Sequence, residues 1–298
     1  MAPSTHGSLL FLLLSCLMMP VAADNVFSNG LVYLPIYLGI ASLANLLLAW
    51  RAWQTLRQGF PSECVGLLIL MMTGVAWCVP CFVQCIGTAI QGAFWGGTVG
   101  CDVMGFYSAL ASYSSQMATL LMAFLTYRIA LSKSVPKWQH VAWTGLGIFV
   151  LSGVVALLPL VGVGAYVKYD GFCYIDYRNA THDVLWLLVA APCLGGALYC
   201  YAAAGRAPVV PTPIRAGLVG LWVVFLLGWV LGFPLIILGL SNSAFPPKLN
   251  LTSGVLGHLM NLVNPLLYGV FWYSAFVEAR APPPSKECEV VQIAESTV

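Results

Sequence analysis

Charged side chains are scarce in this sequence of 298 residues. Lysine and arginine contribute 12 residues and aspartate and glutamate 10, so that 7% of the chain is charged, against about 25% in soluble domains. The net charge of +2 provides no basic patch of the kind that binds nucleic acid. With a mean hydropathy of +0.89, the composition argues against soluble enzymes and nucleic-acid-binding proteins. It predicts a chain that lies mostly in lipid.

Patterns typical of metal sites and of nucleophilic catalysis are also lacking. The cysteines and histidines show no spacing that resembles a zinc site. Within the apolar segments, no serine or cysteine can be combined with both a base and an orienting acid. We therefore expect no metal, no cofactor and no enzymatic activity.

The N-terminus resembles a secretory signal. Residues 9–19 are apolar but too few to span a bilayer, and the small residues Val21, Ala22 and Ala23 follow Pro20. Because the first eight residues contain no lysine or arginine, an uncleaved interfacial segment remains the alternative. We predict a signal peptide over 1–23, a membrane domain over 24–273, and a short amphipathic helix with a cytosolic tail over 274–298.

The membrane domain alternates long apolar stretches with short polar ones. Each stretch has about 20 residues or more, enough for a helix to cross about 30 Å of hydrocarbon. The stretches cover 31–50, 65–87, 103–131, 139–163, 184–204, 216–240 and 251–273. They lack the period-two alternation of a membrane barrel, and no internal repeat suggests a transporter. The sequence predicts an all-α membrane protein, a seven-helix bundle with its N-terminus outside and its C-terminus in the cytosol.

The distribution of basic residues supports this orientation. The inner side would receive Arg51, Arg57, Arg128, Lys133, Lys137, Arg206, Arg215, Arg280 and Lys286, and the outer side Lys168, Arg178 and Lys248. An excess of basic residues is typical of cytoplasmic loops. Both glycosylation sequons, at Asn179 and Asn250, fall on the outer side, where glycosylation takes place.

Two cysteines are placed to pair on the outer side. Cys101 opens the third apolar stretch, and Cys173 lies in the longest outer loop. The oxidising environment outside the cell would allow a disulfide between them. Cys85, near the outer end of the second stretch, is the competing partner.

A motif in the seventh stretch carries a resemblance to a known family. Asn264-Pro265-Leu266-Leu267-Tyr268 fits the Asn-Pro-X-X-Tyr signature of rhodopsin-like G-protein-coupled receptors, in the corresponding helix. Asn45, Trp143, Pro192, Phe225 and Trp229 are similar to family positions in other helices. The resemblance implies a plasma-membrane receptor that transmits the signal of an extracellular or lipid-phase ligand to a heterotrimeric G protein. It also implies that Asn45, Asn264, Pro265 and Tyr268 belong to the signalling switch.

Other positions depart from the family pattern. The Asp-Arg-Tyr of the third helix appears as Thr126-Tyr127-Arg128, without the acid and with arginine and tyrosine transposed. We expect Tyr127 and Arg128 to belong to the same switch as Tyr268. The missing acid also favours a second interpretation, a receptor-like protein that organises partners without activating a G protein. A transporter is a third alternative, less favoured because the stretches contain so few charges.

The chemical class of the ligand can be narrowed from the residues that the predicted helices lack. The position at which opsins attach retinal through a lysine is His258, and Ser108 stands where amine receptors of the family have an aspartate. We expect Ser108, Trp229 and His258 to line a pocket for a small neutral or lipid-like ligand, because no carboxylate is available within the predicted stretches.

The C-terminus suggests a further partner. Phe271, Trp272 and Tyr273 are expected to lie along the membrane in an amphipathic helix. The chain then ends in a polar segment with Ser296 and Val298, which resembles a ligand of PDZ domains. A PDZ-domain protein is therefore a possible cytosolic partner, and a tail that binds nothing is the alternative.

Overall fold

The computed structural model describes residues 26–59, 61–91, 96–169, 172–207, 210, 212–230, 232–241 and 247–273. Eight α-helices are labelled α2 to α9: α2 (Val26–Gly59), α3 (Ser62–Gln91), α4 (Gly97–Ala130), α5 (Trp138–Leu157), α6 (Ala180–Arg206), α7 (Thr212–Val230), α8 (Gly232–Leu240) and α9 (Pro247–Leu267). A 3₁₀ turn covers Leu158–Val161, a π-helical turn covers Tyr268–Trp272, and strands β1 (Tyr166–Tyr169) and β2 (Phe172–Ile175) form an antiparallel hairpin. The predicted signal peptide and C-terminal tail lie outside the described residues.

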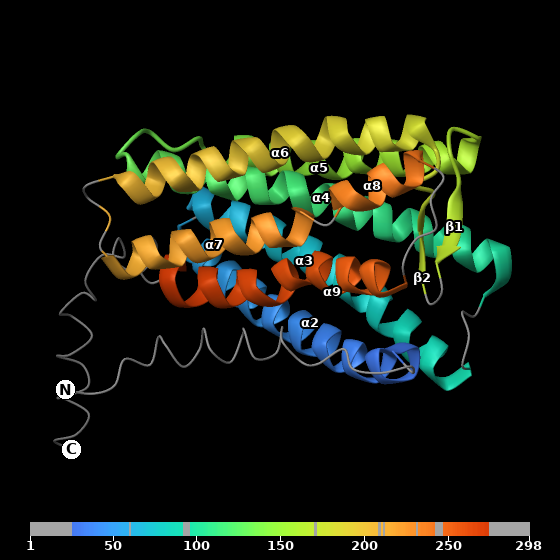
Figure 1. Ribbon diagram of the computed structural model, residues 1–298. Helices are drawn as coiled ribbons and strands as arrows, with labels where there is room; N and C mark the ends of the chain where they lie inside the picture. Colours follow the sequence, from blue (N-terminus) through green and yellow to red (C-terminus); the bar gives the residue numbers. More distant parts are fainter. Residues whose placement is uncertain are drawn as a thin grey trace, which may run out of the picture.

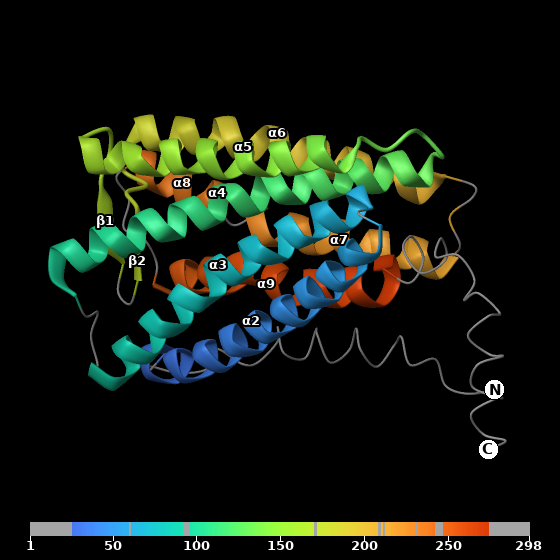
Figure 2. The same cartoon turned by 180° about the vertical axis from the view of Figure 1, so that it is seen from behind.

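The helices form an elongated bundle, with the β-hairpin at one end (Figure 1). In the predicted orientation this is the outer end, and the connection 131–137 between α4 and α5 lies at the inner end (Figures 1 and 2). α4 occupies the centre and packs against α3, α5, α6 and both strands. α2 packs against α3 and α9. α4 is therefore the central helix, in contact both with its neighbouring helices and with the hairpin at the outer end.

Every predicted apolar stretch is helical over most of its length. The sixth, predicted over 216–240, is covered by α7 up to Val230 and by α8 from Gly232, and residue 231 between them lies outside the described residues. Pro234 lies in the first turn of α8, where proline is tolerated because its missing N–H needs no partner within the helix. Counted together, α7 and α8 form the sixth member of the seven-helix bundle.

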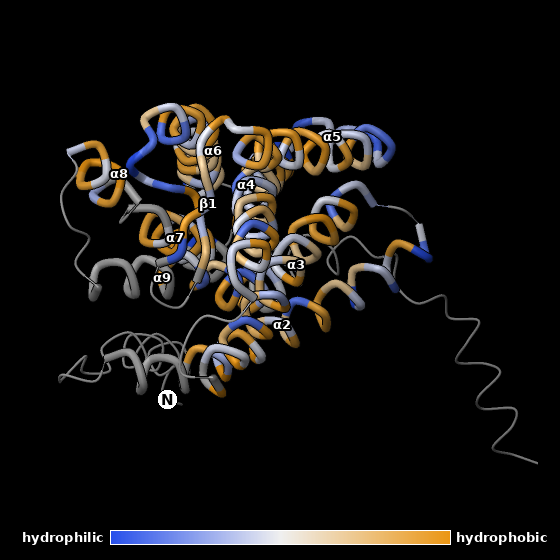
Figure 3. Tube along the Cα trace, turned by 90° about the vertical axis from the view of Figure 1, so that its right-hand side faces the viewer, coloured by the Kyte–Doolittle hydropathy of each residue, from blue (hydrophilic) through white to orange (hydrophobic). Residues whose placement is uncertain are grey.

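The outward faces of the helices are apolar, as expected for contact with lipid. Large hydrophobic side chains are exposed on several helices, among them Trp143, Leu188 and Ile237. Hydrophobic residues recur along α5 and α6 in Figure 3. Within the described ranges, four helices are long and apolar enough to cross a membrane by length and composition alone: Leu34–Gly59, Ser62–Thr88, Trp138–Val161 and Ala180–Arg206.

α4 is as long as these helices but has a more polar interior face. Its buried residues include Ser112, Ser114, Ser115, Gln116, Thr119 and Thr126. Several hydroxyls bond to carbonyls of their own helix; Thr119 Oγ1, for example, donates to the carbonyl oxygen of Ser115 over 2.8 Å. Small residues at a helix interface allow neighbouring helices to approach closely. The small size of these buried residues thus suits the central position of α4.

Candidate functional site

Asn45 links three helices in the middle of the bundle. Its Nδ2 donates to the carbonyl oxygens of Ala41, over 2.7 Å, and of Asn261 on α9, over 2.6 Å. Gly74 of α3 lies against the same side chain, since a Cβ added there would stand 2.5 Å from Asn45 Oδ1. The asparagine that the sequence singled out therefore joins α2, α3 and α9.

Tyr268 of the Asn-Pro-X-X-Tyr motif lies deep in the inner half of the bundle. It is fully buried, and its hydroxyl is hydrogen-bonded to the hydroxyl of Tyr201 on α6 over 2.5 Å. Its ring packs edge-on against Trp272, with 5.7 Å between the ring centroids. The chain is π-helical from Tyr268 to Trp272, just after Pro265. Such π-helical turns are frequently found at functional sites.

Trp272 connects this region to α4. Its indole Nε1 donates to Thr126 Oγ1 over 2.9 Å, and Thr126 in turn donates to the carbonyl oxygen of Met122. Tyr273 is also buried, and its hydroxyl bonds to Thr55 of α2. The expectation that Trp272 and Tyr273 lie along the membrane was therefore wrong. Both side chains find hydrogen-bond partners inside the bundle, and each buries a large aromatic ring there.

Arg128 lies elsewhere than the resemblance implied. Its guanidinium bonds to Ser134 in the inner connection, from Nε to the carbonyl oxygen over 2.8 Å and from NH2 to Oγ over 2.9 Å. Two residues along an α-helix correspond to a rotation of about 200°. Arg128 consequently points away from the side on which Thr126 meets Trp272. Thr126, and not Arg128, occupies the α4 position that contacts the seventh helix.

Tyr127 belongs to the same inner connection. Its hydroxyl accepts a hydrogen bond from Lys133 Nζ over 2.9 Å, and its ring lies 6.1 Å from that of Tyr199 on α6. Tyr127 and Arg128 thus hold the connection 131–137, whereas Thr126, Tyr201, Tyr268 and Trp272 join the helices. The sequence analysis did not predict Thr126 and Tyr201 as residues that join the helices. The available signal was their position on the same long helices as Arg128 and Pro192, which the family resemblance had singled out.

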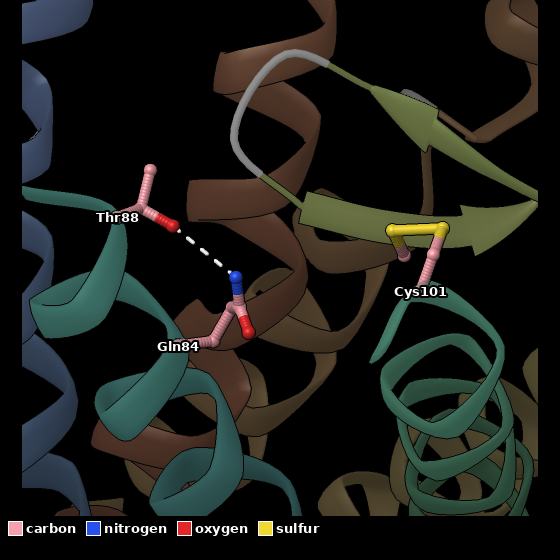
Figure 4. Close-up of a disulfide and its surroundings, with 4 residues drawn as sticks. Gln84, Thr88 and Cys101 are labelled. Carbon is pink, nitrogen blue, oxygen red and sulfur yellow. Dashed lines mark hydrogen bonds between the residues drawn. A yellow bond between two sulfur atoms is a disulfide. The ribbon is translucent and has the colours of Figure 1, made fainter. Parts of the chain in front are cut away.

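At the outer end, a disulfide joins Cys101 in the first turn of α4 to Cys173 in β2 (Figure 4). The two Cα atoms are 5.3 Å apart, and both side chains are buried. Cys85, the competing partner, is a buried free thiol. Close by, Gln84 Nε2 donates to Thr88 Oγ1 on α3 over 3.2 Å (Figure 4). The predicted pairing is confirmed, and the hairpin is covalently fixed to the central helix.

The hairpin also packs on α4 through its tyrosines. Tyr174 donates its hydroxyl to Ser112 Oγ over 3.1 Å, and Tyr166 donates to the carbonyl oxygen of Ala156 on α5 over 2.6 Å. Burial raises the pKa of Tyr174 to about 12, so that its hydroxyl keeps its proton and can act as the donor at neutral pH. The strands therefore close the outer end over α4 and α5.

Two of the three predicted pocket residues lie beside α3. The ring of His258 is 5.0 Å from that of Trp77, and Ser108 lies beside Cys81. Trp77 and Cys81 are four residues apart, so they share one face of α3. His258 of α9 and Ser108 of α4 therefore both lie next to that face. Trp229 is in α7, with its side chain outside the described set.

The outer end contains a carboxylate that the predicted spans excluded. α6 begins at Ala180, four residues before the predicted stretch, and thereby includes Asp183, which is 1% exposed. The predicted stretch was therefore too short at this end and left out a buried carboxylate that belongs to the helix. An isolated buried charge costs several kcal/mol, about 2 kcal/mol of which the N-terminal end of a helix can offset. Burial of the Asp183 carboxylate therefore costs free energy unless a partner compensates for the lost solvation.

Asn179, one of the two sequon asparagines, caps this helix. Its Oδ1 accepts the backbone N–H of His182 over 3.2 Å, and it is half-buried. A glycan would attach through Nδ2 and leave this acceptor in place. The second sequon asparagine, Asn250, lies in the first turns of α9, with its side chain outside the described set.

Comparison with known proteins identifies receptors. Over 136 residues the chain is 30% identical to the lutropin-choriogonadotropic hormone receptor of Sus scrofa, a match that covers 44% of this chain and 18% of that receptor. Over 156 residues it is 30% identical to the C5a anaphylatoxin chemotactic receptor 2 of Rattus norvegicus, covering 49% of this chain and 44% of the receptor. The matches thus span less than half the length of these curated relatives. No family model matches the chain.

The fold is that of squid rhodopsin. The two structures agree with a TM-score of 0.68 over 93% of each chain, at 15% sequence identity. This likeness concerns the fold, because the sequences have diverged widely. It accounts for the seven-helix arrangement, and the curated matches are themselves receptors. The chain therefore has the fold of squid rhodopsin, is similar to receptors over about half of its length, and has the long apolar helices of a multi-pass membrane protein.

Proposed function

We propose that this chain is a cell-surface receptor that transmits a ligand signal to a heterotrimeric G protein. The observation that supports the proposal best is the connected inner region of Thr126, Tyr201, Tyr268 and Trp272, which joins α4, α6 and the seventh helix. A rearrangement of the seventh helix has to break or remake these two hydrogen bonds. Such a set of contacts can bias two arrangements of the bundle, and a ligand that prefers one of them shifts the equilibrium.

Signalling by a panel of G proteins in cells tests this proposal. We expect basal activity above that of untransfected cells, because the chain lacks the acid that would restrain the inactive state. Tyr268→Phe, which removes only the hydroxyl, should change that activity several-fold at equal surface expression. Tyr107→Phe on the exposed face of α4 is the matched control and should leave it unchanged. Absence of basal activity with every G protein would contradict the proposal.

For the ligand we propose a small neutral or lipid-like molecule bound near Ser108, Trp229 and His258. The described neighbours of Ser108 and His258 on α3 are the uncharged Cys81 and Trp77. Because such pockets combine apolar walls with a few polar groups, His258 would orient the ligand. Photo-crosslinking with a diazirine-bearing fatty alcohol should label α3 or α9, and His258→Ala should reduce labelling several-fold. Labelling confined to outward-facing residues would contradict the pocket.

The second candidate is a receptor-like protein that assembles partners without activating a G protein. The position of Arg128 favours it, because this side chain holds Ser134 in the inner connection instead of facing the seventh helix. The tail ending in Ser296 and Val298 offers a site for a PDZ-domain protein. A tail peptide should bind a panel of purified PDZ domains, and amidation of its terminal carboxylate should abolish binding. Failure of the free-acid peptide to bind any domain would exclude this partner.

A further inference from the structure

Two titratable side chains are buried side by side at the outer end of α6. His182 and Asp183 are each 1% exposed, and neither imidazole nitrogen nor carboxylate oxygen of these residues has a hydrogen-bond partner. Across the interface with α4, Tyr113 is fully buried, and its hydroxyl is likewise unpaired. Buried polar groups are nearly always hydrogen-bonded, so this concentration of unpaired atoms requires an explanation.

The surrounding hydroxyls are committed to other bonds. Tyr166 donates to the carbonyl of Ala156 and Tyr174 to Ser112, as described above. Asp183 lies close enough to Tyr113 for their charges to interact, and Asp176 is near both Asp183 and His182. The site therefore offers one fully buried carboxylate, a second carboxylate at the loop before α6, and a buried phenol hydroxyl.

The loop before β1 covers this group. Gly164 has a φ of 93°, and a Cβ at this position would stand 2.7 Å from His182 Nδ1, so that the backbone lies directly on the imidazole. Gly162 also has a positive φ, of 89°. Only glycine adopts such conformations without strain and permits this close approach. The covering loop thus approaches His182 at Gly164, whereas Gly162 supplies only the positive φ of the turn.

We propose that Asp183 and Tyr113 form a binding site for a small organic ammonium ion. An ammonium ion would donate N–H groups to the Asp183 carboxylate and to the Tyr113 oxygen, so that both groups gain a hydrogen bond that they lack. Tyr174 neighbours both Tyr113 and Trp186, and aromatic faces attract organic cations. A calcium ion requires six or more oxygen ligands, and the described residues contain no group of three side chains placed to hold a metal.

This site is distinct from the pocket proposed around Ser108. Ser108 and Tyr113 are five residues apart on α4, a rotation of about 140°, so they point to different neighbours. Ser108 lies by α3, whereas Tyr113 interacts with Asp183 of α6. The inference does not rest on G-protein coupling, because it concerns binding to the outer half and can be measured without any signalling partner.

The experiment uses the full chain in lipid nanodiscs, with benzylammonium chloride as the probe. Calorimetric titration at neutral pH and constant ionic strength should give saturable binding. Benzyl alcohol, which has the same ring without the charge, should bind at least tenfold more weakly. Sodium chloride alone should give no saturable heat. Absence of benzylammonium binding, or equal binding of the alcohol, would overturn the proposal.

Three variants distinguish the site from unspecific attraction. Asp183→Asn removes the charge at constant size and should weaken benzylammonium binding at least tenfold. Tyr113→Phe removes only the unpaired hydroxyl and keeps the proposal testable if the first variant fails to fold; we expect several-fold weaker binding. Asp102→Asn, on the exposed face of α4, is the control and should bind as the unaltered chain does. Unchanged binding in both Asp183→Asn and Tyr113→Phe would exclude the site.

Discussion

The indole of Trp272 and the hydroxyl of Thr126 form a hydrogen bond of 2.9 Å that ties the end of the seventh helix to the central helix. Both residues are buried, and Thr126 stands where the resemblance would place the acid of the third-helix motif. The bond lies next to the contact between Tyr201 and Tyr268. The inner half of the bundle is thus joined by neutral side chains instead of by an arginine.

Thr126→Val should destabilise the fold, because the indole N–H of Trp272 would lose its buried acceptor. A buried unpaired donor costs about 1–3 kcal/mol. Thermal unfolding in detergent micelles measures the change. Thr144→Val on the exposed face of α5, where the hydroxyl bonds only to its own helix, should have a much smaller effect. Equal effects of the two substitutions would contradict the role of this hydrogen bond.

Gly74→Ala should disturb the junction of α2, α3 and α9. The added methyl group would collide with the Asn45 side chain and displace it from the carbonyl of Asn261. Overpacking of this kind costs typically about 1–3 kcal/mol, measurable as a lower unfolding temperature. The control is Gly147→Ala on α5, which meets open space and should be neutral or stabilising by about 0.5–1 kcal/mol. A stable Gly74→Ala variant would show that the junction can rearrange.

Cys173→Ser should reduce stability and surface expression. The disulfide closes a long loop, and such bonds typically contribute about 2–4 kcal/mol. The variant should also expose a thiol at Cys101 that reacts with a membrane-impermeant maleimide. Cys85→Ser should leave the disulfide intact, since Cys85 is a separate free thiol. Peptide mapping that finds Cys85 linked to Cys173 would contradict the observed pairing.

Asn179 is expected to serve two purposes that mutations can separate. Thr181→Ala destroys the sequon but keeps the cap of α6, so it should remove the glycan and leave the unfolding temperature nearly unchanged. Asn179→Gln should remove the glycan and also cost about 0.5–2 kcal/mol of stability through loss of the cap. Gel mobility after glycosidase treatment and thermal unfolding measure the two effects. An identical mobility before and after treatment would show that the sequon is unused.

The helices and the disulfide could be predicted because they depend on local properties. Apolar length determines which segments span lipid, and Cys101 and Cys173 were brought together by the order of the helices. It was harder to predict which residues of a helix face the bundle, because a sequence motif does not fix the rotation of the helix about its axis. Arg128 was therefore expected in the inner switch beside Tyr268, whereas the residue of this motif that contacts the seventh helix is Thr126. The limits of α6 were also decisive, because an error of four residues excluded Asp183.

The bond between Cys101 and Cys173 closes α4, α5 and the hairpin into a covalent ring. Lys133 and Lys137 lie in this ring at the opposite end of the bundle, and both are exposed. A trypsin cut at either lysine would open the backbone without separating the fragments, which would part only after reduction. In sealed vesicles, the protease would have to reach the inner face to make that cut. Lys168 also lies in the ring, at the outer end, so the sizes of the two fragments after reduction distinguish a cut at the inner connection from one at the hairpin. The ring thus reports on which side of the membrane the connection between α4 and α5 lies.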